Sequence, residues 1–153
     1  MHYIIIIALV ALDQTVKYFV RSNMSLGQSF PVISDILHIT HISNSGGAFS
    51  ILQGQTAVLV IIPTLLIAII MIYMYKKRNG DFMLLVSLSL ICGGGAGNLI
   101  DRVRLGAVVD YIDFRIFPVF NIADICVCCG CGLMLIYILI IDRKEKVKCE
   151  NVQ

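Results

Sequence analysis

Charged side chains are scarce in this sequence: only 14% of its 153 residues are Asp, Glu, Lys or Arg. Soluble domains usually have about 25% charged and about 45–50% apolar residues. Here 58% of the residues are hydrophobic, and the mean hydropathy is +0.88. A soluble chain of this length could not bury so much apolar surface in one core. The composition therefore excludes a soluble domain and predicts that lipid covers much of the chain.

The sequence also lacks the patterns of several other function classes. The glycine-rich residues 93–97 follow no strand and precede no Lys-Ser or Lys-Thr pair, which excludes a phosphate-binding loop. Gly93 and Gly97 instead have the small-x-x-x-small spacing that lets a second helix approach closely. The histidines are not spaced as metal ligands, no serine has a plausible His and Asp partner, and no basic-aromatic patch indicates nucleic-acid binding. We expect no cofactor and no nucleic-acid partner.

Four of the six cysteines fall in one apolar segment near the C-terminus, at Cys126, Cys128, Cys129 and Cys131. Cys-x-x-Cys spacing occurs twice there, but four thiols around one helix cannot enclose a tetrahedral metal. We interpret them as small apolar packing residues and expect neither a metal nor a redox role.

Four apolar segments are each near the roughly 20 residues that cross a hydrocarbon core. They run from about 3–20, 56–75, 82–100 and 122–141. Backbone groups in lipid must be satisfied within the segment, so these are helices. The length leaves no room for a second domain. We predict an all-α membrane protein of four transmembrane helices, with residues 1–153 forming one membrane-embedded domain.

The first segment is not typical of a cleaved signal peptide. No Lys or Arg precedes Ile4, and no small-x-small cleavage site follows the apolar run. We expect it to be a retained helix.

Lys and Arg in the short loops predict the orientation. Basic residues gather between the second and third segments and after the fourth, at Lys76, Lys77, Arg78, Arg143, Lys144, Lys146 and Lys148. With four helices these two sites lie on one side, which we predict to be cytoplasmic together with both termini. Residues 21–55 and 101–121 then lie on the outer face.

Both outer segments contain alternating apolar residues. Residues 37–42 have a period of two, which predicts a short strand or two between the first and second helices, and the glycines of 44–49 predict a turn. Residues 106–116 also alternate. A strand there would place Asp110 and Asp113 on opposite faces, so only one of them can face a given site. The alternation does not decide which.

Ionisable residues at membrane level are costly and indicate function by default. Here they gather toward the outer ends of the predicted helices: Asp13, Lys17, Asp101, Arg102, Asp110 and Asp124. Asp13 and Lys17 share a helix face, either as a structural ion pair or as support for a polar site. Asp101 and Arg102 form either a salt bridge or helix cap, or a polar network with Asn98.

Asp124 lies in the first turn of the fourth helix, after the candidate N-cap Asn121. It is either simply a favourable acid at a helix start or part of a catalytic pair. If Asp110 and Asp124 approach within a few ångströms, they share one proton. One carboxylate can then take a proton from water while the other protonates a scissile carbonyl. The helix start favours Asp124 as the ionised partner.

Five sequence blocks stand in order along the chain: DQTVK at 13–17, NSGGAF at 44–49, GGAGNLIDR at 94–102, GAVVDYI at 106–112 and FNIAD at 120–124. Together they resemble the D-Q-x-x-K, N-x-G-x-A-F, G-x-x-G-N-x-x-D-R, G-x-V-V-D and F-N-x-A-D blocks of the lipoprotein signal peptidase (signal peptidase II) family. Phe117 replaces a frequent Trp of that family, and Ile125 replaces a frequent Ser.

The resemblance implies an intramembrane aspartyl endopeptidase of the bacterial cell (inner) membrane. It would remove signal peptides from diacylglyceryl-modified prolipoproteins just before the lipid-modified cysteine, among membrane lipids, and bind globomycin-type inhibitors. Asp110 and Asp124 would be the catalytic pair near the extracytoplasmic face, without metal or cofactor. Site support or substrate binding would come from Asp13, Lys17, Asn44, Asn98, Asp101, Arg102 and Asn121.

Two other function classes remain open. A small transporter or channel would place polar residues near the midplane, often at broken helices. The second and fourth segments lack such residues, although Pro63 interrupts the second. A non-catalytic membrane scaffold would pair its charges and leave no exposed dyad.

Overall fold

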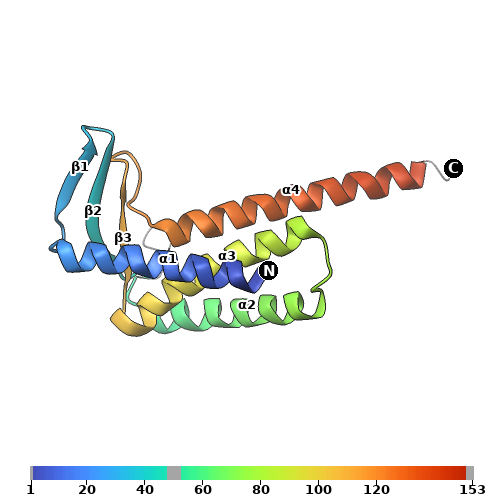
Figure 1. Cartoon of the computed structure of the whole chain (residues 1–153), viewed down its shortest axis with the longest axis horizontal. Helices are drawn as coiled ribbons and strands as arrows, with labels where there is room; N and C mark the ends of the chain where they lie inside the picture. Colours follow the sequence, from blue (N-terminus) through green and yellow to red (C-terminus); the bar gives the residue numbers. More distant parts are fainter. Residues whose placement is uncertain (1, 48–52, 151–153) are drawn as a thin grey trace.

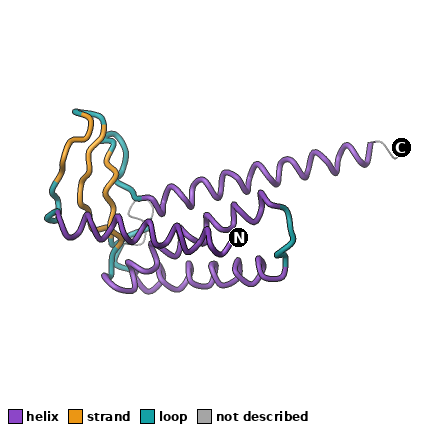
Figure 2. The backbone as a smooth tube through the Cα atoms, viewed as in Figure 1, coloured by secondary structure: helices purple, strands orange, loops and turns teal. Residues whose placement is uncertain are grey.

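The computed structural model of the chain describes residues 2–47 and 53–150, with side chains up to Ile141. Figure 1 and Figure 2 show a helical bundle with a small sheet at one end. The helices are α1 (His2–Asn23), α2 (Thr56–Lys76), α3 (Phe82–Leu105) and α4 (Ile122–Glu150), and the strands are β1 (Ser29–Ile33), β2 (Leu37–Asn44) and β3 (Val108–Asp113). Ala48 and Phe49 of the predicted turn lie outside the described residues.

All four helices are long and apolar enough to span a membrane, as predicted. In α3 half of the most apolar stretch is buried, against 11–17% in the other three helices. The third helix is therefore the centre of the bundle, and α1, α2 and α4 pack around it. Lipid covers the exposed apolar faces of the outer three.

Three helices continue well past the apolar stretches that predicted them. α1 ends at Asn23, α3 at Leu105 and α4 at Glu150. Gly106 ends α3 in the left-handed conformation (φ 77°), and its N–H donates to the Arg102 carbonyl (3.0 Å). An apolar stretch predicts only the part of a helix that lies in hydrocarbon. The helix itself continues beyond it for as long as its backbone hydrogen bonds do, in α3 up to the cap at Gly106. Asp101 and Arg102 consequently belong to the last turns of α3.

Glycines let the neighbours of α3 approach closely. A side chain at Gly93 would meet Leu9 of α1 at 3.0 Å, and one at Gly97 would meet an Asp13 oxygen at 2.5 Å. A side chain at Gly94 would collide with the Ala123 carbonyl of α4. The small-x-x-x-small spacing is thus a packing feature, as predicted.

The sheet is antiparallel with the order β1-β2-β3. β3 comes from the segment between α3 and α4, so the sheet joins the two outer segments, a pairing that alternation alone did not predict. Asn44 lies opposite Val108, and Ile42 lies opposite Asp110, beyond an irregularity in the register. The pairing brings the end of β2 next to the first half of β3, where the predicted site residues gather.

Candidate active site

Asp110 lies in the buried strand β3 and is only 3% exposed. Its Oδ1 accepts a hydrogen bond from Asn121 Nδ2 (2.7 Å), and its Oδ2 accepts one from Asn44 Nδ2 (3.0 Å). Burial raises the pKa of Asp110 to about 6; the two amide donors oppose the rise, and the nearby charge of Asp124 adds to it. This carboxyl group is therefore protonated at a pH where an ordinary aspartate is ionised.

Asp124 and Asn121 cap the start of α4 reciprocally. Asn121 Oδ1 accepts the Asp124 N–H (3.0 Å), and Asp124 Oδ2 accepts the Asn121 N–H (3.1 Å). Asp124 Oδ1 also accepts a hydrogen bond from Asn98 Nδ2 (2.8 Å). The predicted N-cap is confirmed. The helix start and two donors, one on each oxygen, hold the Asp124 carboxylate in one orientation.

Asn121 connects the two aspartates, which its predicted role as a cap did not include. The side chain is fully buried. Its Oδ1 caps Asp124, while its Nδ2 donates to Asp110 Oδ1 (2.7 Å) and to Asn98 Oδ1 (3.1 Å). Asn121 thus binds both carboxyl groups, that of Asp110 through its side-chain amide and that of Asp124 through its backbone N–H.

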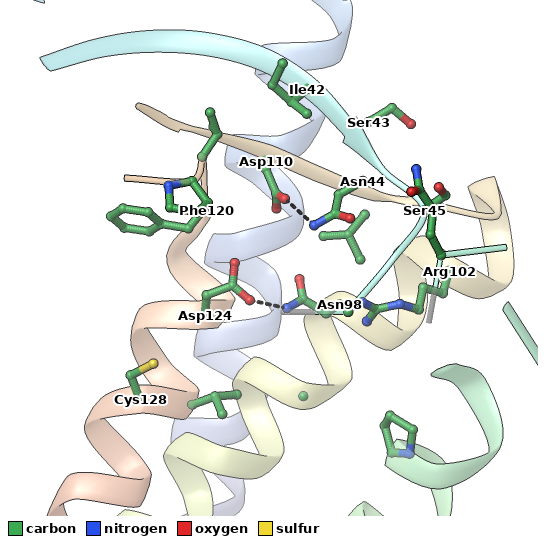
Figure 3. A pocket seen from close by; sticks show the side chains of 18 of the residues that line it. Ile42, Ser43, Asn44, Ser45, Asn98, Arg102, Asp110, Phe120, Asp124 and Cys128 are labelled. Carbon is green, nitrogen blue, oxygen red and sulfur yellow. Dashed lines mark hydrogen bonds between the residues drawn. The ribbon is translucent and has the colours of Figure 1, made fainter. Parts of the chain in front are cut away.

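Both carboxyl groups face a cavity of about 700 Å³ (Figure 3). Its polar upper wall comes from β2, β3 and the end of α3. Its lower walls are apolar and come from α2, α3 and α4. The lining includes Asn44, Ser45, Asn98, Arg102, Asp110 and Asp124, and the apolar Ile62, Leu66, Ile67, Ile91, Phe117, Val119, Phe120 and Val127. A ligand here would meet two carboxyl groups at one end and hydrocarbon side chains at the other.

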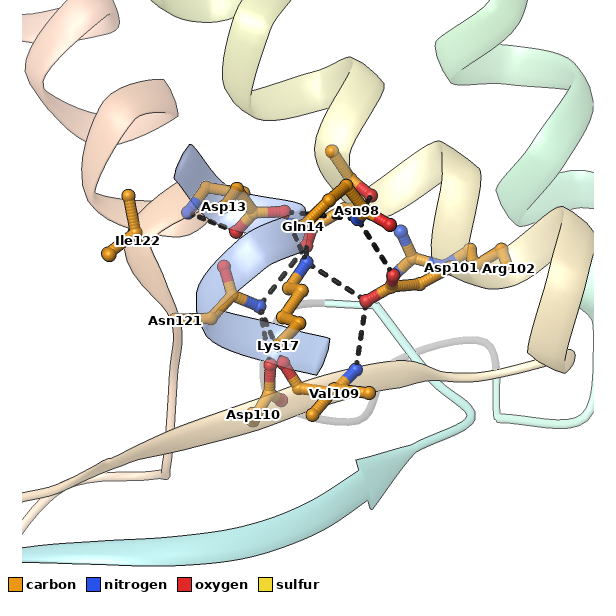
Figure 4. A network of polar contacts seen from close by, with 12 residues as sticks. Asp13, Gln14, Lys17, Asn98, Asp101, Arg102, Val109, Asp110, Asn121 and Ile122 are labelled. Carbon is orange, nitrogen blue, oxygen red and sulfur yellow. Dashed lines mark hydrogen bonds and ion pairs between the residues drawn. The ribbon is translucent and has the colours of Figure 1, made fainter. Parts of the chain in front are cut away.

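Lys17 is the centre of a second, closed cluster beside this cavity (Figure 4). Its Nζ lies 2.9 Å from Asp13 Oδ2 and 2.9 Å from Asp101 Oδ2, and donates to Asn98 Oδ1 (2.8 Å). Lys17, Asp13 and Asp101 are at most 2% exposed. The two alternatives for Asp13 and Lys17 both hold, because the ion pair is structural and also contacts Asn98 of the site.

The two buried carboxylates of this cluster also hold the backbone beside the site. Asp101 Oδ2 accepts the N–H of Val109 (3.1 Å), the residue before Asp110. Asp13 Oδ1 accepts the N–H of Ala123 (3.2 Å), the residue before Asp124. The cluster therefore couples α1 and α3 to the backbone position of each cavity-facing aspartate.

Sequence reasoning missed Gln14 as a member of this network. Its Nε2 donates to Asp101 Oδ1 (2.9 Å), the Gly97 carbonyl (3.1 Å) and Asp13 Oδ2 (3.3 Å). Its place in the DQTVK block was the available signal. The predicted network of Asn98, Asp101 and Arg102 is found only in part: Lys17 connects Asp101 with Asn98, and no hydrogen bond or ion pair of Arg102 with either is observed in the described part of the chain.

Arg102 holds the chain after β2. Its Nη2 donates to the Gly46 carbonyl (2.9 Å), and the Gly46 N–H donates to Asn44 Oδ1 (2.9 Å). The buried Nε of Arg102 has no hydrogen-bond partner among the described atoms. The Arg102 side chain lines the cavity, so its guanidinium group can donate to a ligand there.

The structure separates Asp113 from Asp110. Asp113 Oδ2 accepts a hydrogen bond from Thr40 Oγ1 (2.8 Å) and lies 3.3 Å from Arg115 Nη1. It does not line the cavity. The two aspartates thus have different partners, as the alternation predicted, and Asp110 is the one at the cavity.

The interpretation of the cysteines of α4 as packing residues is wrong for three of them. Cys126 is buried, but Cys128, Cys129 and Cys131 are exposed, and Cys128 lines the cavity. Only one face of α4 packs against α3, so the other thiols face lipid or the cavity. Among residues 2–47 and 53–150, no group of His, Cys, Asp and Glu is arranged to hold a metal ion.

Comparisons with known proteins agree with this geometry. Residues 5–140 match the family described as signal peptidase (SPase) II. The chain is 46% identical to a lipoprotein signal peptidase of Halothermothrix orenii, covering 96% of this chain and 99% of that protein. It is 41% identical to a lipoprotein signal peptidase of Shouchella clausii, covering 95% and 97%. Two solved bacterial membrane enzymes, each 37% identical, superpose with TM-scores of 0.84 and 0.81 over 90% of this chain and 87% and 92% of theirs.

Proposed function

This chain belongs to the signal peptidase II family, and we propose that it is an intramembrane aspartyl endopeptidase. It removes the signal peptide from diacylglyceryl-modified prolipoproteins by cleaving just before the lipid-modified cysteine. The observation that carries the aspartyl mechanism is the shared cavity of Asp110 and Asp124, whose carboxyl groups are both bound by Asn121.

In this mechanism the pair holds one proton, on Asp110, and Asp124 is ionised. Burial favours the neutral Asp110, while the helix start and the Asn98 amide favour the Asp124 carboxylate. Lys17 donates to Asn98 Oδ1 and so orients the Asn98 amide, whose Nδ2 donates to Asp124. The pair titrates as a unit, so the assignment describes its dominant singly protonated form.

Cleavage follows from this protonation state. Asp124 takes a proton from water as the water oxygen bonds to the scissile carbonyl carbon, and Asp110 gives its proton to the carbonyl oxygen. The diol intermediate then returns one hydroxyl proton to Asp110, and Asp124 passes its proton to the amide nitrogen. The C–N bond breaks, and the pair regains its single proton. The Arg102 guanidinium, which lines the cavity, donates to a substrate carbonyl beside this centre.

The apolar lower walls of the cavity support a lipid-bearing substrate. Ile62 and Leu66 of α2 face the cavity from one side and Val127 of α4 from the other. An apolar signal-peptide segment and the acyl chains can remain in hydrocarbon while the peptide bond reaches the aspartates. The sheet end of the bundle then faces the extracytoplasmic side of the bacterial cell (inner) membrane, and both termini are cytoplasmic, consistent with the basic loops. Globomycin-type inhibitors occupy the same cavity.

The charges argue against the two alternative classes. Among the described side chains, no cation lies within salt-bridge distance of Asp110 or Asp124, whereas Asp13 and Asp101 share Lys17. A non-catalytic scaffold is expected to pair its buried charges, whereas these two carboxyl groups face a cavity. A transporter is disfavoured because α2 has no Asp, Glu, Lys or Arg before Lys76, and α4 has none between Asp124 and Asp142.

The test is cleavage of a diacylated prolipoprotein by purified protein, followed as a gel shift. Asp110→Asn and Asp124→Asn should each abolish cleavage, and globomycin should inhibit the unaltered protein. Asp113→Asn is the matched control, because it alters the same strand away from the cavity. Near-normal turnover in either cavity variant would refute the dyad, and an unaltered protein without cleavage would refute the substrate.

A further inference from the structure

The loop between β3 and α4 carries the most exposed large apolar side chain in the described part of the chain. Ile116 is 95% exposed, and Phe114 beside it is 40% exposed. Both lie outside the four spans. An isoleucine so fully exposed is unfavourable in water, and its position needs an explanation.

The loop is closed and ordered despite this exposure. Ile112 N–H donates to the Phe120 carbonyl (2.8 Å), and Phe120 N–H donates back to Ile112 (3.1 Å). The rings of Phe114 and Phe120 stack with centroids 5.9 Å apart. Arg115 adopts the left-handed conformation (φ 64°), and its N–H donates to Asp113 Oδ1 (2.8 Å). These hydrogen bonds and the stacked rings fix the loop in the conformation that leaves Ile116 exposed.

The loop adjoins the start of the fourth candidate membrane span. It leads directly into α4, which begins at Ile122, and Figure 1 shows it on the side of the sheet that faces α4. The exposed Ile125 in the first turn of α4 continues the apolar surface toward the lipid-facing side of that helix. Phe120 at the base of the loop lines the cavity. The tip is therefore continuous with the lipid contact of α4 on one side and with the cavity wall on the other.

We propose that residues 114–117 form a membrane-surface anchor whose tip enters the bilayer leaflet on the sheet side, with Phe114 and Ile116 against phospholipid acyl chains. Arg115 suits this depth, because its side chain is about half exposed beside Asp113 and can stay at the headgroups. The anchor holds the adjoining cavity wall at the level of the lipid. The proposal concerns lipid contact and does not depend on the peptidase reaction.

The absence of tryptophan from the chain makes a direct test possible, since a single introduced Trp is the only indole. Ile116→Trp is reconstituted in phosphatidylcholine vesicles, and its emission is measured with acyl chains brominated near the headgroup. Ser25→Trp is the matched control, because Ser25 is exposed in the connection between α1 and β1, which Figure 1 shows at the end of α1 and away from the start of α4. Ile138→Trp, on an exposed position of α4, reports full lipid contact.

Brominated lipid should quench Ile116→Trp roughly twofold or more beyond Ser25→Trp, with emission at shorter wavelength. Phe114→Trp keeps an aromatic ring and should behave in the same way, so it decides the matter if Ile116→Trp does not fold. Emission and iodide quenching equal to those of Ser25→Trp, without quenching by brominated lipid, would overturn the anchor.

Discussion

Two aspartate clusters lie next to each other at the sheet end of the bundle, and among the described side chains only one of them has a cation within ion-pair distance. In the closed cluster, Lys17 lies 2.9 Å from both Asp13 and Asp101. In the open pair, Asp110 and Asp124 have amide donors and a cavity in front of them. The same side-chain type is bound to a buried cation in the closed cluster, whereas in the open pair amide donors hold it at a cavity, where we propose that it transfers protons.

The largest expected effect comes from the open pair. Asp124→Asn should lower the cleavage rate by roughly 10⁴-fold, as loss of a residue that acts only in the transition state does. The unfolding temperature should change little, because Asn can still accept the Asn121 N–H that Asp124 accepts. Rate and thermal unfolding measured on one preparation check this. A large fall in the unfolding temperature would place Asp124 with the structural cluster instead.

In the closed cluster, by contrast, loss of a charged side chain should lower the stability of the protein. Lys17→Met leaves two buried carboxylates without their cation, which should cost about 3–5 kcal/mol of stability. Thermal unfolding in detergent measures the loss, and Lys76→Met at the exposed C-terminal end of α2 is the control. Adding Asp13→Asn should restore part of the stability, since it removes one of the unpaired charges. An unfolding temperature unchanged by Lys17→Met would contradict the structural role.

A smaller loss of stability should follow from a steric contact with the closed cluster that leaves all of its charges in place. In Gly97→Ala the new methyl group would lie 2.5 Å from Asp13 Oδ2, so Asp13 must shift, at about 1–3 kcal/mol. Gly132→Ala on α4 is the matched control, because nothing lies within 4 Å of its added carbon. Equal unfolding temperatures for the two variants would show that the contact between α1 and α3 can relax freely.

The smallest expected effect is a shift in the pH dependence of cleavage, caused by a change in the pKa of Asp110 in the open pair. The reaction needs the proton on Asp110, whose pKa is about 6, so the rate should fall as pH rises above that value. Asn44 donates to the ionised form and so lowers this pKa. Asn44→Ala removes that effect, raises the pKa and should move the alkaline fall to higher pH. A fall that stays in place, or moves to lower pH, would argue against Asp110 as the proton donor.

Much of this site was predictable because its residues fall in short local blocks. The cap at Asn121 depends on residues three apart, and Asp13 and Lys17 on residues one helical turn apart. Contacts between blocks were not predictable from either block alone. Asn121 binding to Asp110 joins a helix start to a strand, and Asp101 binding to Val109 joins a helix to the same strand. The exposure of Cys128 was likewise missed, since it depends on which face of α4 meets α3.

The sequence by itself determined the four spanning helices, because lipid allows an apolar run of this length few structures other than a helix with its backbone hydrogen bonds satisfied. It also placed the ionisable residues toward one end. Only the tertiary structure decided which aspartates are neutralised and which face the cavity. The environment of each aspartate depends on the position of Lys17 on α1 and on the pairing of β2 with β3. Hydropathy and periodicity act along the chain, whereas the environment of a carboxyl group is set by neighbours far from it in sequence.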